Sequence, residues 1–301
     1  KRNEIEIYIS IMEIFELKYF LAVAQVENVN RAAENIYVSA GSLSKAISRL
    51  EEELGVPLFF KSGRGIRLTP EGQHLKKRAA DILALEEDVK FELRGAEVGT
   101  VNIYISSEEI LQTAYGVSIV KKIEKQIPQA RVHFLIRSEA VAIQQVLNGE
   151  VHMALVTQDP PINTVSKTIA EVDFKTCASP KHWLLKGKSF KRKIPIDNLI
   201  KYPFVSPDSA ILGKVSSGSL DGWHDDRFPR DIKYKVCGLR LMENLIQEGL
   251  ALAYLPEYFI EASGFRALNV SGCSFTCSQT VKVLTKDPKA LSWLNLLWDH
   301  I

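Results

Sequence analysis

The chain has 301 residues, of which 46% are hydrophobic and 25% charged, and its formal net charge is +2. The length allows two domains with separate cores, or three small ones, and the composition is ordinary for a globular protein. No apolar run approaches the ~20 residues that a membrane-spanning helix needs, so no membrane is expected among the partners. A net charge near zero neither requires nor excludes nucleic acid, since DNA binding needs a local basic surface.

The N-terminus and the cysteines bear on the compartment. Residues 1–11 lack the continuous apolar core and the small-residue cleavage site of an export signal. The four cysteines, Cys177, Cys237, Cys273 and Cys277, all lie in the C-terminal half. We therefore expect a cytoplasmic protein with reduced thiols. Cys273 and Cys277 are near enough in sequence to form a bridge, and structural burial is the favoured alternative.

The first clear elements are three short helices and a hairpin. An apolar stripe at helical spacing predicts the first helix. Asn30 predicts the N-cap of a second helix, and Ser39 that of a third, which stops before Pro57. Two hydrophobic runs around the glycine turn at 62–65 predict a two-stranded wing. Residues 12–69 therefore predict a winged helix-turn-helix.

The third predicted helix offers a surface that suits DNA. Its face opposite the apolar stripe carries short or cationic residues, which can approach a major groove and donate to base edges or phosphates. The wing adds cations that suit phosphates or a narrow minor groove. A purely structural three-helix module is the alternative, because three glutamates follow Arg49 directly. The candidate DNA-binding residues are Asn30, Ser39, Ala40, Gly41, Ser44, Lys45, Ser48, Arg49, Lys61, Arg64 and Arg67.

A long helix follows the wing. Thr69 and Pro70 predict its start, and it runs to about Arg94. Its narrow apolar seam has no predicted domain beneath it, so a partner helix is the natural cover. Residues 70–96 are thus predicted to be a linker and dimerisation helix, the alternative being a helix packed on its own domain. The seam residues are Leu75, Ala79, Ile82, Val89 and Leu93.

From Thr100 onward, strand patterns alternate with helix patterns. Such units predict an α/β fold with a parallel sheet and helices on its faces. Ligands of these folds bind beyond the carboxyl ends of the strands, near helix N-termini. Ser106 and Ser107 directly follow the first predicted strand, where their hydroxyls and backbone N–H groups suit an anion. Ser206 and Ser209 form a second pair of serines near a later predicted strand. The two serine pairs and Arg137 favour a small carboxylate as ligand, whereas Arg137 as a surface cation is the alternative.

Several motifs occur in order along the first part of the chain. They are Phe15-Glu-Leu-Lys-Tyr-Phe20, Asn30-Arg-Ala-Ala33, Val38-Ser39, Leu43-Ser-Lys-Ala-Ile47, Leu50-Glu-Glu-Glu-Leu-Gly-Val-Pro-Leu-Phe59 and Leu68-Thr-Pro-Glu-Gly72. Gly99-Thr-Val and Gly249-Leu-Ala-Leu-Ala-Tyr-Leu-Pro256 extend the pattern. Together they closely resemble the LysR-type transcriptional regulators.

This resemblance implies a sequence-specific regulator of transcription with no cofactor. Its expected partners are double-stranded promoter DNA, a second copy in a homodimer or homotetramer, and a small-molecule effector of unknown identity, with RNA polymerase as a further candidate. The family's effector domain is similar to periplasmic binding proteins, with a ligand cleft between two α/β subdomains. The implied parts are the winged domain at 12–69, the linker at 70–96 and the effector domain at 100–301, divided into subdomain I (100–172 and 274–301) and subdomain II (173–273).

In that family, the loops after the strands converge on the cleft. Arg137 and Ser138 follow the second predicted strand, although Ser138 as a simple helix cap is the alternative. The effector-binding candidates are Ser106, Ser107, Arg137, Ser138, Thr157, Gln158, Ser206, Asp208 and Ser209.

The chain also departs from the family pattern. Ala40 and Gly41 stand where the family often has Gln-Pro, which removes a side chain able to contact adenine at two points. Lys45 and Lys61 stand where arginine is frequent. His152 stands where aspartate is usual, which puts the hydrogen bonding around it in question.

Two other functions compete with this reading. An α/β enzyme would carry a phosphate loop, a Gly-x-Gly-x-x-Gly turn, a Gly-x-Ser-x-Gly elbow or a cluster of metal ligands, and the sequence has none of these. His182 and His224 are isolated, so we expect no metal site and no catalytic residue. A solute-binding protein of the transport type is the second alternative, against which the winged domain argues.

Overall fold

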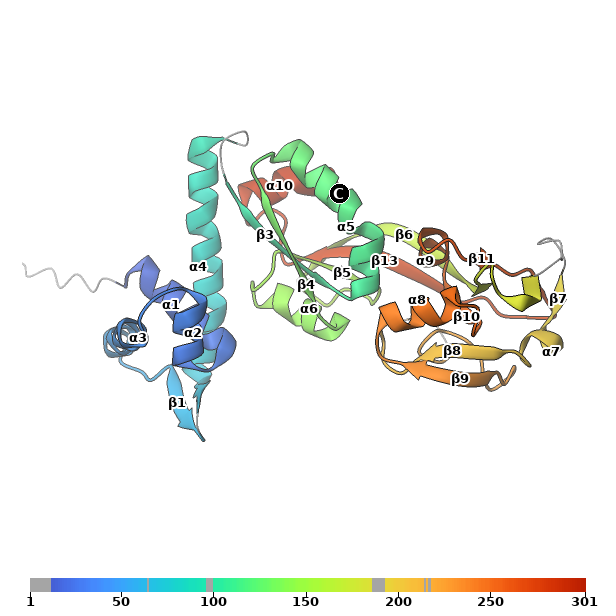
Figure 1. Cartoon of the computed structure of the whole chain (residues 1–301). Coiled ribbons are helices and arrows are strands. Elements are labelled where there is room, and N and C mark those ends of the chain that lie inside the picture. Colours follow the sequence, from blue (N-terminus) through green and yellow to red (C-terminus); the bar gives the residue numbers. More distant parts are fainter. Residues whose placement is uncertain (1–11, 64, 96–99, 186–192, 214, 216–217) are drawn as a thin grey trace, which may run out of the picture. The chain divides into compact units, whose positions relative to one another are not determined.

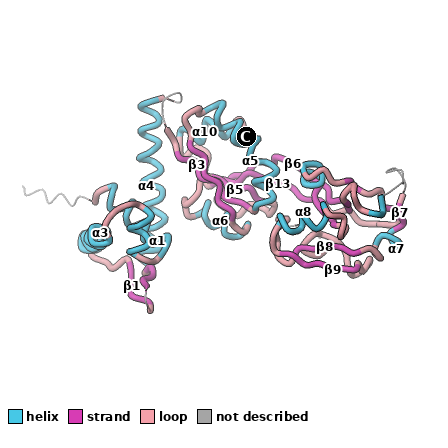
Figure 2. The backbone as a smooth tube through the Cα atoms, viewed as in Figure 1, coloured by secondary structure: helices cyan, strands magenta, loops and turns pink. Residues whose placement is uncertain are grey.

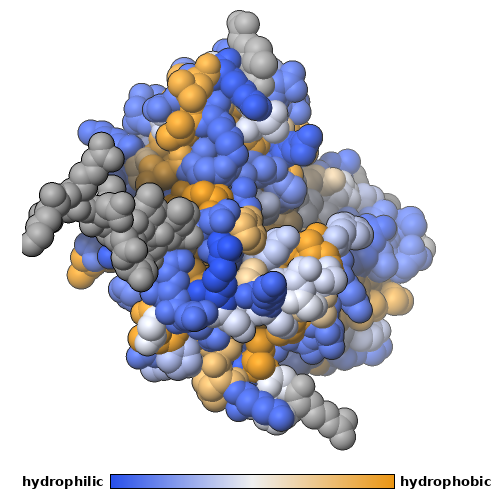
Figure 3. Space-filling model, turned by 90° about the vertical axis from the view of Figure 1, so that its left-hand side faces the viewer, coloured by the Kyte–Doolittle hydropathy of each residue, from blue (hydrophilic) through white to orange (hydrophobic). Residues whose placement is uncertain are grey.

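The structure is a computed structural model, and it describes residues 12–63, 65–95, 100–185, 193–213, 215 and 218–301 (Figure 1). The chain divides into an N-terminal unit, residues 1–93 with 148–150, and a C-terminal unit, residues 94–147 and 151–301. Among the described residues, no helix is both long and apolar enough to cross a bilayer. On the face of the molecule drawn in Figure 3, hydrophilic residues cover most of the surface, with smaller hydrophobic areas between them.

The N-terminal unit is a winged helix-turn-helix followed by a long helix. Asn28 caps the second helix, because its side chain accepts a hydrogen bond from the Arg31 backbone N–H at 3.0 Å. The prediction of Asn30 as this cap was therefore wrong. Ser39 caps the third helix as predicted, and accepts from the Ser42 N–H at 3.0 Å. The elements are α1 (Ile14–Val26), α2 (Val29–Asn35), α3 (Ala40–Leu54), β1 (Phe59–Ser62), β2 (Gly65–Leu68) and α4 (Pro70–Arg94).

A single glycine lets the long helix approach the wing. A Cβ placed on Gly72 would lie 2.2 Å from the Leu58 carbonyl oxygen and 2.9 Å from the Leu68 side chain. Thr69 fixes the helix start, since its hydroxyl accepts from the Gly72 N–H at 3.0 Å and donates to the Pro57 carbonyl at 2.7 Å. The wing and α4 therefore share one core with the three helices.

The apolar seam of α4 meets two different surroundings. Ala79 is fully buried, and Leu75 and Ile82 pack against the core of the winged domain. The premise that no domain lies beneath the helix was therefore wrong for its first half. Val89 and Leu93 are 53% and 83% exposed, so the seam is uncovered in the second half. The sequence pattern could not distinguish the buried half of the seam from the exposed half, because a stripe of apolar residues can pack either on its own domain or on a partner helix.

The C-terminal unit is built on a mixed sheet. Its strands follow the order β10-β6-β13-β5-β3-β4, and β11 also pairs with β6. β3 is parallel to β4 and β5, whereas β13 runs antiparallel to β5 and β6. The prediction of a parallel sheet was therefore correct only for one end. The elements of the sheet are β3 (Asn102–Ser107), β4 (Arg131–Ile136), β5 (Met153–Val156), β6 (Val165–Ala178), β10 (Ala253–Pro256), β11 (Arg266–Ala267) and β13 (Ser278–Thr285).

Helices cover both faces of this sheet, with α5 and α10 on one side of β3 and β5 and α6 on the other (Figure 2). A separate parallel pair, β8 with β9, packs with α8. β6 runs without a break through the predicted subdomain boundary at 172/173, so that boundary stays a prediction. The remaining elements are α5 (Glu109–Gln126), α6 (Glu139–Leu147), a 3₁₀ turn (Trp183–Leu185), β7 (Ile194–Pro195), α7 (Ile196–Leu199), β8 (Pro203–Pro207), β9 (Asp231–Val236), α8 (Leu239–Gln247), α9 (Glu257–Ala262), β12 (Val270–Ser271) and α10 (Ser292–Trp298).

Candidate DNA-binding surface and effector cleft

The outer face of α3 is open to solvent. Leu43, Ile47 and Leu50 point into the core, which leaves the opposite side of the helix uncovered. The predicted DNA-binding residues on that side are exposed as the helical spacing requires: Gly41, Ser44, Lys45 and Ser48. Small side chains and one cation form a surface that a major groove could accept without steric obstruction.

Arg49 has a different environment from its neighbours. Its guanidinium Nε donates to Glu16 at 2.5 Å, and a terminal nitrogen donates to Glu13 at 2.9 Å. Glu16 is fully buried and also accepts from the Glu13 backbone N–H, so Arg49 ties α3 to the start of α1. These ion pairs give Arg49 a structural role, while its contact with DNA stays a prediction.

The wing distributes its cations over two faces. Phe60 pairs with Arg67, and Lys61 pairs with Ile66, in the antiparallel ladder of β1 and β2. Directly opposed residues share a face and successive residues alternate, so Lys61 and Arg67 point to opposite sides of the hairpin. Both are exposed. Arg64, predicted at the wing tip, lies outside the described residues.

A cleft of about 500 Å³ opens in the C-terminal unit where the predicted subdomains meet. It lies where an effector was expected, near the helix starts that follow β3 and β4. Its polar lining includes Glu108 before α5, Glu139 at the start of α6, and Ser219 from the loop after β8. We call this cavity the effector cleft; its described lining residues are Glu108, Ser138, Glu139, Ala140, Gln158, Ala210, Gly213, Val215, Gly218, Ser219 and Leu220.

Two carboxylates dominate the chemistry of the effector cleft. Glu139 accepts from the backbone N–H groups of Thr157 and Gln158 and from the Thr157 hydroxyl. Glu108 accepts one hydrogen bond, from the Glu139 N–H at 3.2 Å. Burial raises the pKa of Glu108 above its ordinary value, and the charge of Glu139 acts in the same direction.

The predicted effector residues divide between the cleft and the interior. Ser138 and Gln158 line the effector cleft. Ser106 and Ser107 are fully buried, and their hydroxyls donate to the Gln145 side chain at 2.9 Å and the Glu108 carbonyl at 3.2 Å. The hydroxyl protons of both serines are therefore already used in hydrogen bonds within the protein.

The other predicted residues lie outside the described lining of the cleft. Thr157 donates its backbone N–H and hydroxyl to the Glu139 carboxylate. Arg137 is exposed and donates to the neighbouring carbonyl of Ile136 at 2.8 Å. Ser206 is buried, while Asp208 and Ser209 are exposed. Sequence reasoning missed the acidic residues, because an acid in the first turn of a helix is common on dipole grounds alone. The missed lining residues with polar side chains are Glu108, Glu139 and Ser219, and those with a close backbone approach are Gly213 and Gly218.

The cysteines and metal ligands can be placed within the described part of the chain. All four cysteines are free thiols: Cys177 and Cys277 are buried, Cys237 is exposed and Cys273 is partly exposed. Of the Cys273 and Cys277 pair, Cys277 is thus buried, as the favoured alternative of structural burial requires, and Cys273 is not. No group of three or more potential ligands that could hold a metal ion occurs among the described residues.

Comparison with known families covers both units. Residues 14–73 match the description "Bacterial regulatory helix-turn-helix protein, lysR family". Residues 97–301 match "LysR substrate binding domain". The chain belongs to the LysR family. It is accordingly a DNA-binding transcription regulator with an effector-binding domain, and not an enzyme, as the sequence motifs predicted.

Curated relatives are similar to this chain in sequence, and solved structures are similar to it in fold. A probable RuBisCO transcriptional regulator of Synechocystis sp. is 25% identical over 255 residues, which is 82% of this chain and 72% of the relative. Full-length OxyR from Pseudomonas aeruginosa shares the fold, with a TM-score of 0.65, 17% identity and coverage of 96% of this chain and 94% of that chain. Full-length CbnR, solved in complex with its target DNA, has a TM-score of 0.60, 19% identity and coverage of 96% and 99%.

Proposed function

We propose that this regulator acts as a homodimer in the cytoplasm, presents two copies of α3 to promoter DNA, and is controlled by a small molecule in the effector cleft. A ligand that prefers one arrangement of the subunits would shift the population between DNA-bound states, whereas a ligand that binds both equally would change nothing. Assembly of two dimers into a tetramer and contact with RNA polymerase belong to the same proposal. The observation that carries it is the exposed small-and-cationic face of α3, within a chain of this family.

The DNA-reading role rests on Lys45, which is exposed on α3. A gel-shift assay on genomic fragments should show a preferred DNA, and Lys45→Ala should weaken its binding. If Lys45 contacts a phosphate, the slope of binding against salt should fall by about 0.9 per site. Glu52→Ala is the matched control, since Glu52 is exposed on the same side of α3 two turns after Lys45, and loss of an acid cannot remove a phosphate contact. No preference for any fragment over competitor DNA would refute the regulator function.

The dimer rests on the uncovered second half of the α4 seam. Leu85, Val89 and Leu93 are 52%, 53% and 83% exposed, and a second α4 would cover them. Val89→Asp should halve the mass measured by light scattering, because it places a charge in the proposed helix pair. Gln73→Asp is the control, as it adds the same charge to an exposed site in the first turn of α4. An unchanged mass for Val89→Asp would exclude this interface.

The effector class follows from the charges in the cleft. Among its described lining residues, the charged side chains are Glu108 and Glu139, and an anion would meet both carboxylates. We therefore favour an effector with an amine or another group rich in N–H donors over the small carboxylate that the serines suggested. The carboxylate of Glu139 is already bonded to Thr157 and Gln158, so Glu108 is the group available to a ligand.

A thermal-shift screen of amines and carboxylates of similar size tests this class. The expected ligands are amines, and Glu108→Gln should reduce their affinity about tenfold or more, since a charge-assisted hydrogen bond is lost. Glu109→Gln is the matched control, since it removes the neighbouring charge at an exposed site in the first turn of α5, outside the described lining of the cleft. If carboxylates bind the wild type, and bind Glu108→Gln more tightly, the proposed class of effector is wrong. The DNA-binding function would not be affected by that result.

A further inference from the structure

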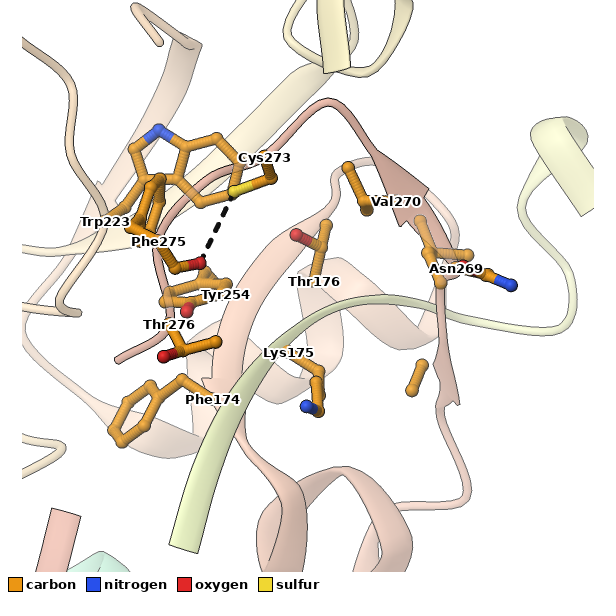
Figure 4. Close-up of a pocket in the computed structure, with 12 residues that line it drawn as sticks. Phe174, Lys175, Thr176, Trp223, Tyr254, Asn269, Val270, Cys273, Phe275 and Thr276 are labelled. Atoms are coloured by element: carbon orange, nitrogen blue, oxygen red, sulfur yellow. Dashed lines mark hydrogen bonds between the residues drawn. The ribbon is translucent and has the colours of Figure 1, made fainter. Parts of the chain in front are cut away.

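The walls of the pocket drawn in Figure 4 are already engaged within the protein. Its rings Trp223, Tyr254 and Phe174 are almost completely buried and pack against one another. The Lys175 ammonium lies near two carboxylates, at 3.5 and 3.9 Å. Groups that the fold leaves unused are found at the surface instead. Among the described residues, Tyr37 of the N-terminal unit is the most exposed of the large hydrophobic side chains, at 95%.

Tyr37 lies in the turn between α2 and α3, and the end of α2 determines its backbone conformation. The Tyr37 N–H donates to the Glu34 carbonyl at 3.3 Å, and the Val38 N–H donates to the Ala33 carbonyl at 3.0 Å. These two bonds form a Schellman motif, in which the first residue after the helix cap takes the left-handed conformation. That residue is Tyr37, and its φ is +56°. The turn of the helix-turn-helix therefore imposes a positive φ on a tyrosine.

Tyrosine is an unfavourable residue for this position. Glycine, and to a lesser extent asparagine, adopts a positive φ at little cost, whereas a bulky side chain is strained there. Packing does not offset the strain, because the Tyr37 side chain is almost fully exposed while its neighbours Ile36 and Val38 pack against the core. Folding alone would therefore favour a smaller residue. A benefit that outweighs the strain has to come from a bound molecule.

The place of Tyr37 in the chain indicates which molecule that is. In helix-turn-helix docking, the helix before the turn crosses the DNA backbone, and the first residues of the reading helix contact base edges. The turn that joins the two helices therefore lies beside the phosphates at the edge of the groove. Tyr37 comes two residues before Ser39, the N-cap of α3, and both residues are exposed. Tyrosine hydroxyls are among the groups that donate hydrogen bonds to DNA phosphates.

We propose that Tyr37 donates its hydroxyl proton to a DNA phosphate beside the reading face of α3, and thereby helps to fix the register of α3 in the groove. This inference rests on the proposed docking of α3 to promoter DNA. The contact is neutral, so it releases no counterion from the DNA, in contrast to a phosphate contact made by Lys45. A protein partner is the competing occupant of an exposed ring, and the position of Tyr37 just before the α3 cap favours DNA.

Fluorescence anisotropy of the preferred DNA fragment, titrated with the full chain, tests the contact. Tyr37→Phe removes only the hydroxyl, and should weaken binding by about threefold to tenfold for each docked copy of α3. The slope of binding against salt should stay at its wild-type value in Tyr37→Phe, whereas Lys45→Ala should lower it. Gln25→Ala truncates an exposed side chain of α1 in the same unit, and as the control it should leave the affinity unchanged.

Tyr37→Gly separates loss of the contact from loss of folding. Glycine adopts a positive φ without strain, so hydrogen exchange in α2 and α3 should be as slow as in the wild type or slower, while DNA affinity falls as in Tyr37→Phe. Wild-type affinity in both variants would overturn the proposal and favour a protein partner. A loss confined to Tyr37→Gly would assign the effect to the ring and overturn the phosphate contact. Lys45→Ala reports the docking of α3 independently, so the proposed function can stand when the Tyr37 contact fails.

Discussion

His152 should make the C-terminal unit sensitive to mild acid. Its ring Nδ1 accepts from the Tyr104 backbone N–H at 3.1 Å, and the His152 backbone N–H donates to the Tyr104 carbonyl at 3.0 Å. The ring also meets Trp293 edge to face at 5.0 Å. Because Nδ1 accepts, the neutral ring carries its proton on Nε2. At this position the histidine therefore offers the Tyr104 N–H an acceptor.

Protonation of this ring is unfavourable in the folded state. Burial lowers the pKa of His152 to about 4, from an ordinary value of 6.5. Below pH 6.5 the unfolded chain therefore binds a proton that the folded chain does not, and stability falls as the pH drops toward 4. From pH 7 to pH 5 the loss attributable to this group is about 2 kcal/mol. A proton on Nδ1 would also face the Tyr104 N–H, donor against donor.

Urea unfolding followed by tryptophan fluorescence measures this loss. Trp183, Trp223, Trp293 and Trp298 all lie in the C-terminal unit, so the signal reports that unit alone. His152→Asn is the matched variant, because it keeps an acceptor for Tyr104 and does not titrate. Burial also lowers the pKa of His182 in this unit, but the wild type and His152→Asn share its effect on stability. Equal pH dependence in the wild type and His152→Asn would refute the reasoning.

Two further substitutions test the packing. Gly72→Ala should destabilise the N-terminal unit by about 1–3 kcal/mol, because its Cβ would overlap the Leu58 carbonyl, and faster hydrogen exchange in α4 should report it. Hydrogen-exchange rates equal to those of the wild type would show that the backbone around Leu58 can move aside at little cost. Asp221→Asn should cost the C-terminal unit about 3 kcal/mol by leaving Arg230 half-paired, visible as a lower urea midpoint. A midpoint matching the wild type would mean that Asp225 alone suffices.

The N-terminal unit was largely predictable because its signals are local. Caps, a glycine stop and a 3.6-residue period each act within a few residues of the element that they define. The cap of α2 was misplaced by two positions, because Asn28 and Asn30 are both asparagines and the backbone conformation decides between them. Asn28 has extended φ and ψ of −152° and 117°, which lets its side chain reach the Arg31 N–H.

The sequence predicted the position of the effector cleft, but not which of its residues are available to a ligand. The rule that ligands bind beyond strand ends located its edge, and Ser138 and Gln158 do line it. The partners of each hydroxyl depend on residues far apart in sequence, such as Ser106 with Gln145. A serine that is already bonded within the core and a serine free for a ligand look the same in the sequence.

The structure limits which side chains of α3 are available to contact DNA bases. Direct recognition of guanine is strongest when an arginine fork contacts two base acceptors. Arg49 is the arginine of this helix, and Glu13 and Glu16 already bind its fork. Ala40 and Gly41 add no base-reading side chain, so Lys45 and the hydroxyls of Ser44 and Ser48 remain. These groups discriminate bases less sharply, and we therefore expect phosphate contacts and the shape of the DNA to supply much of the specificity.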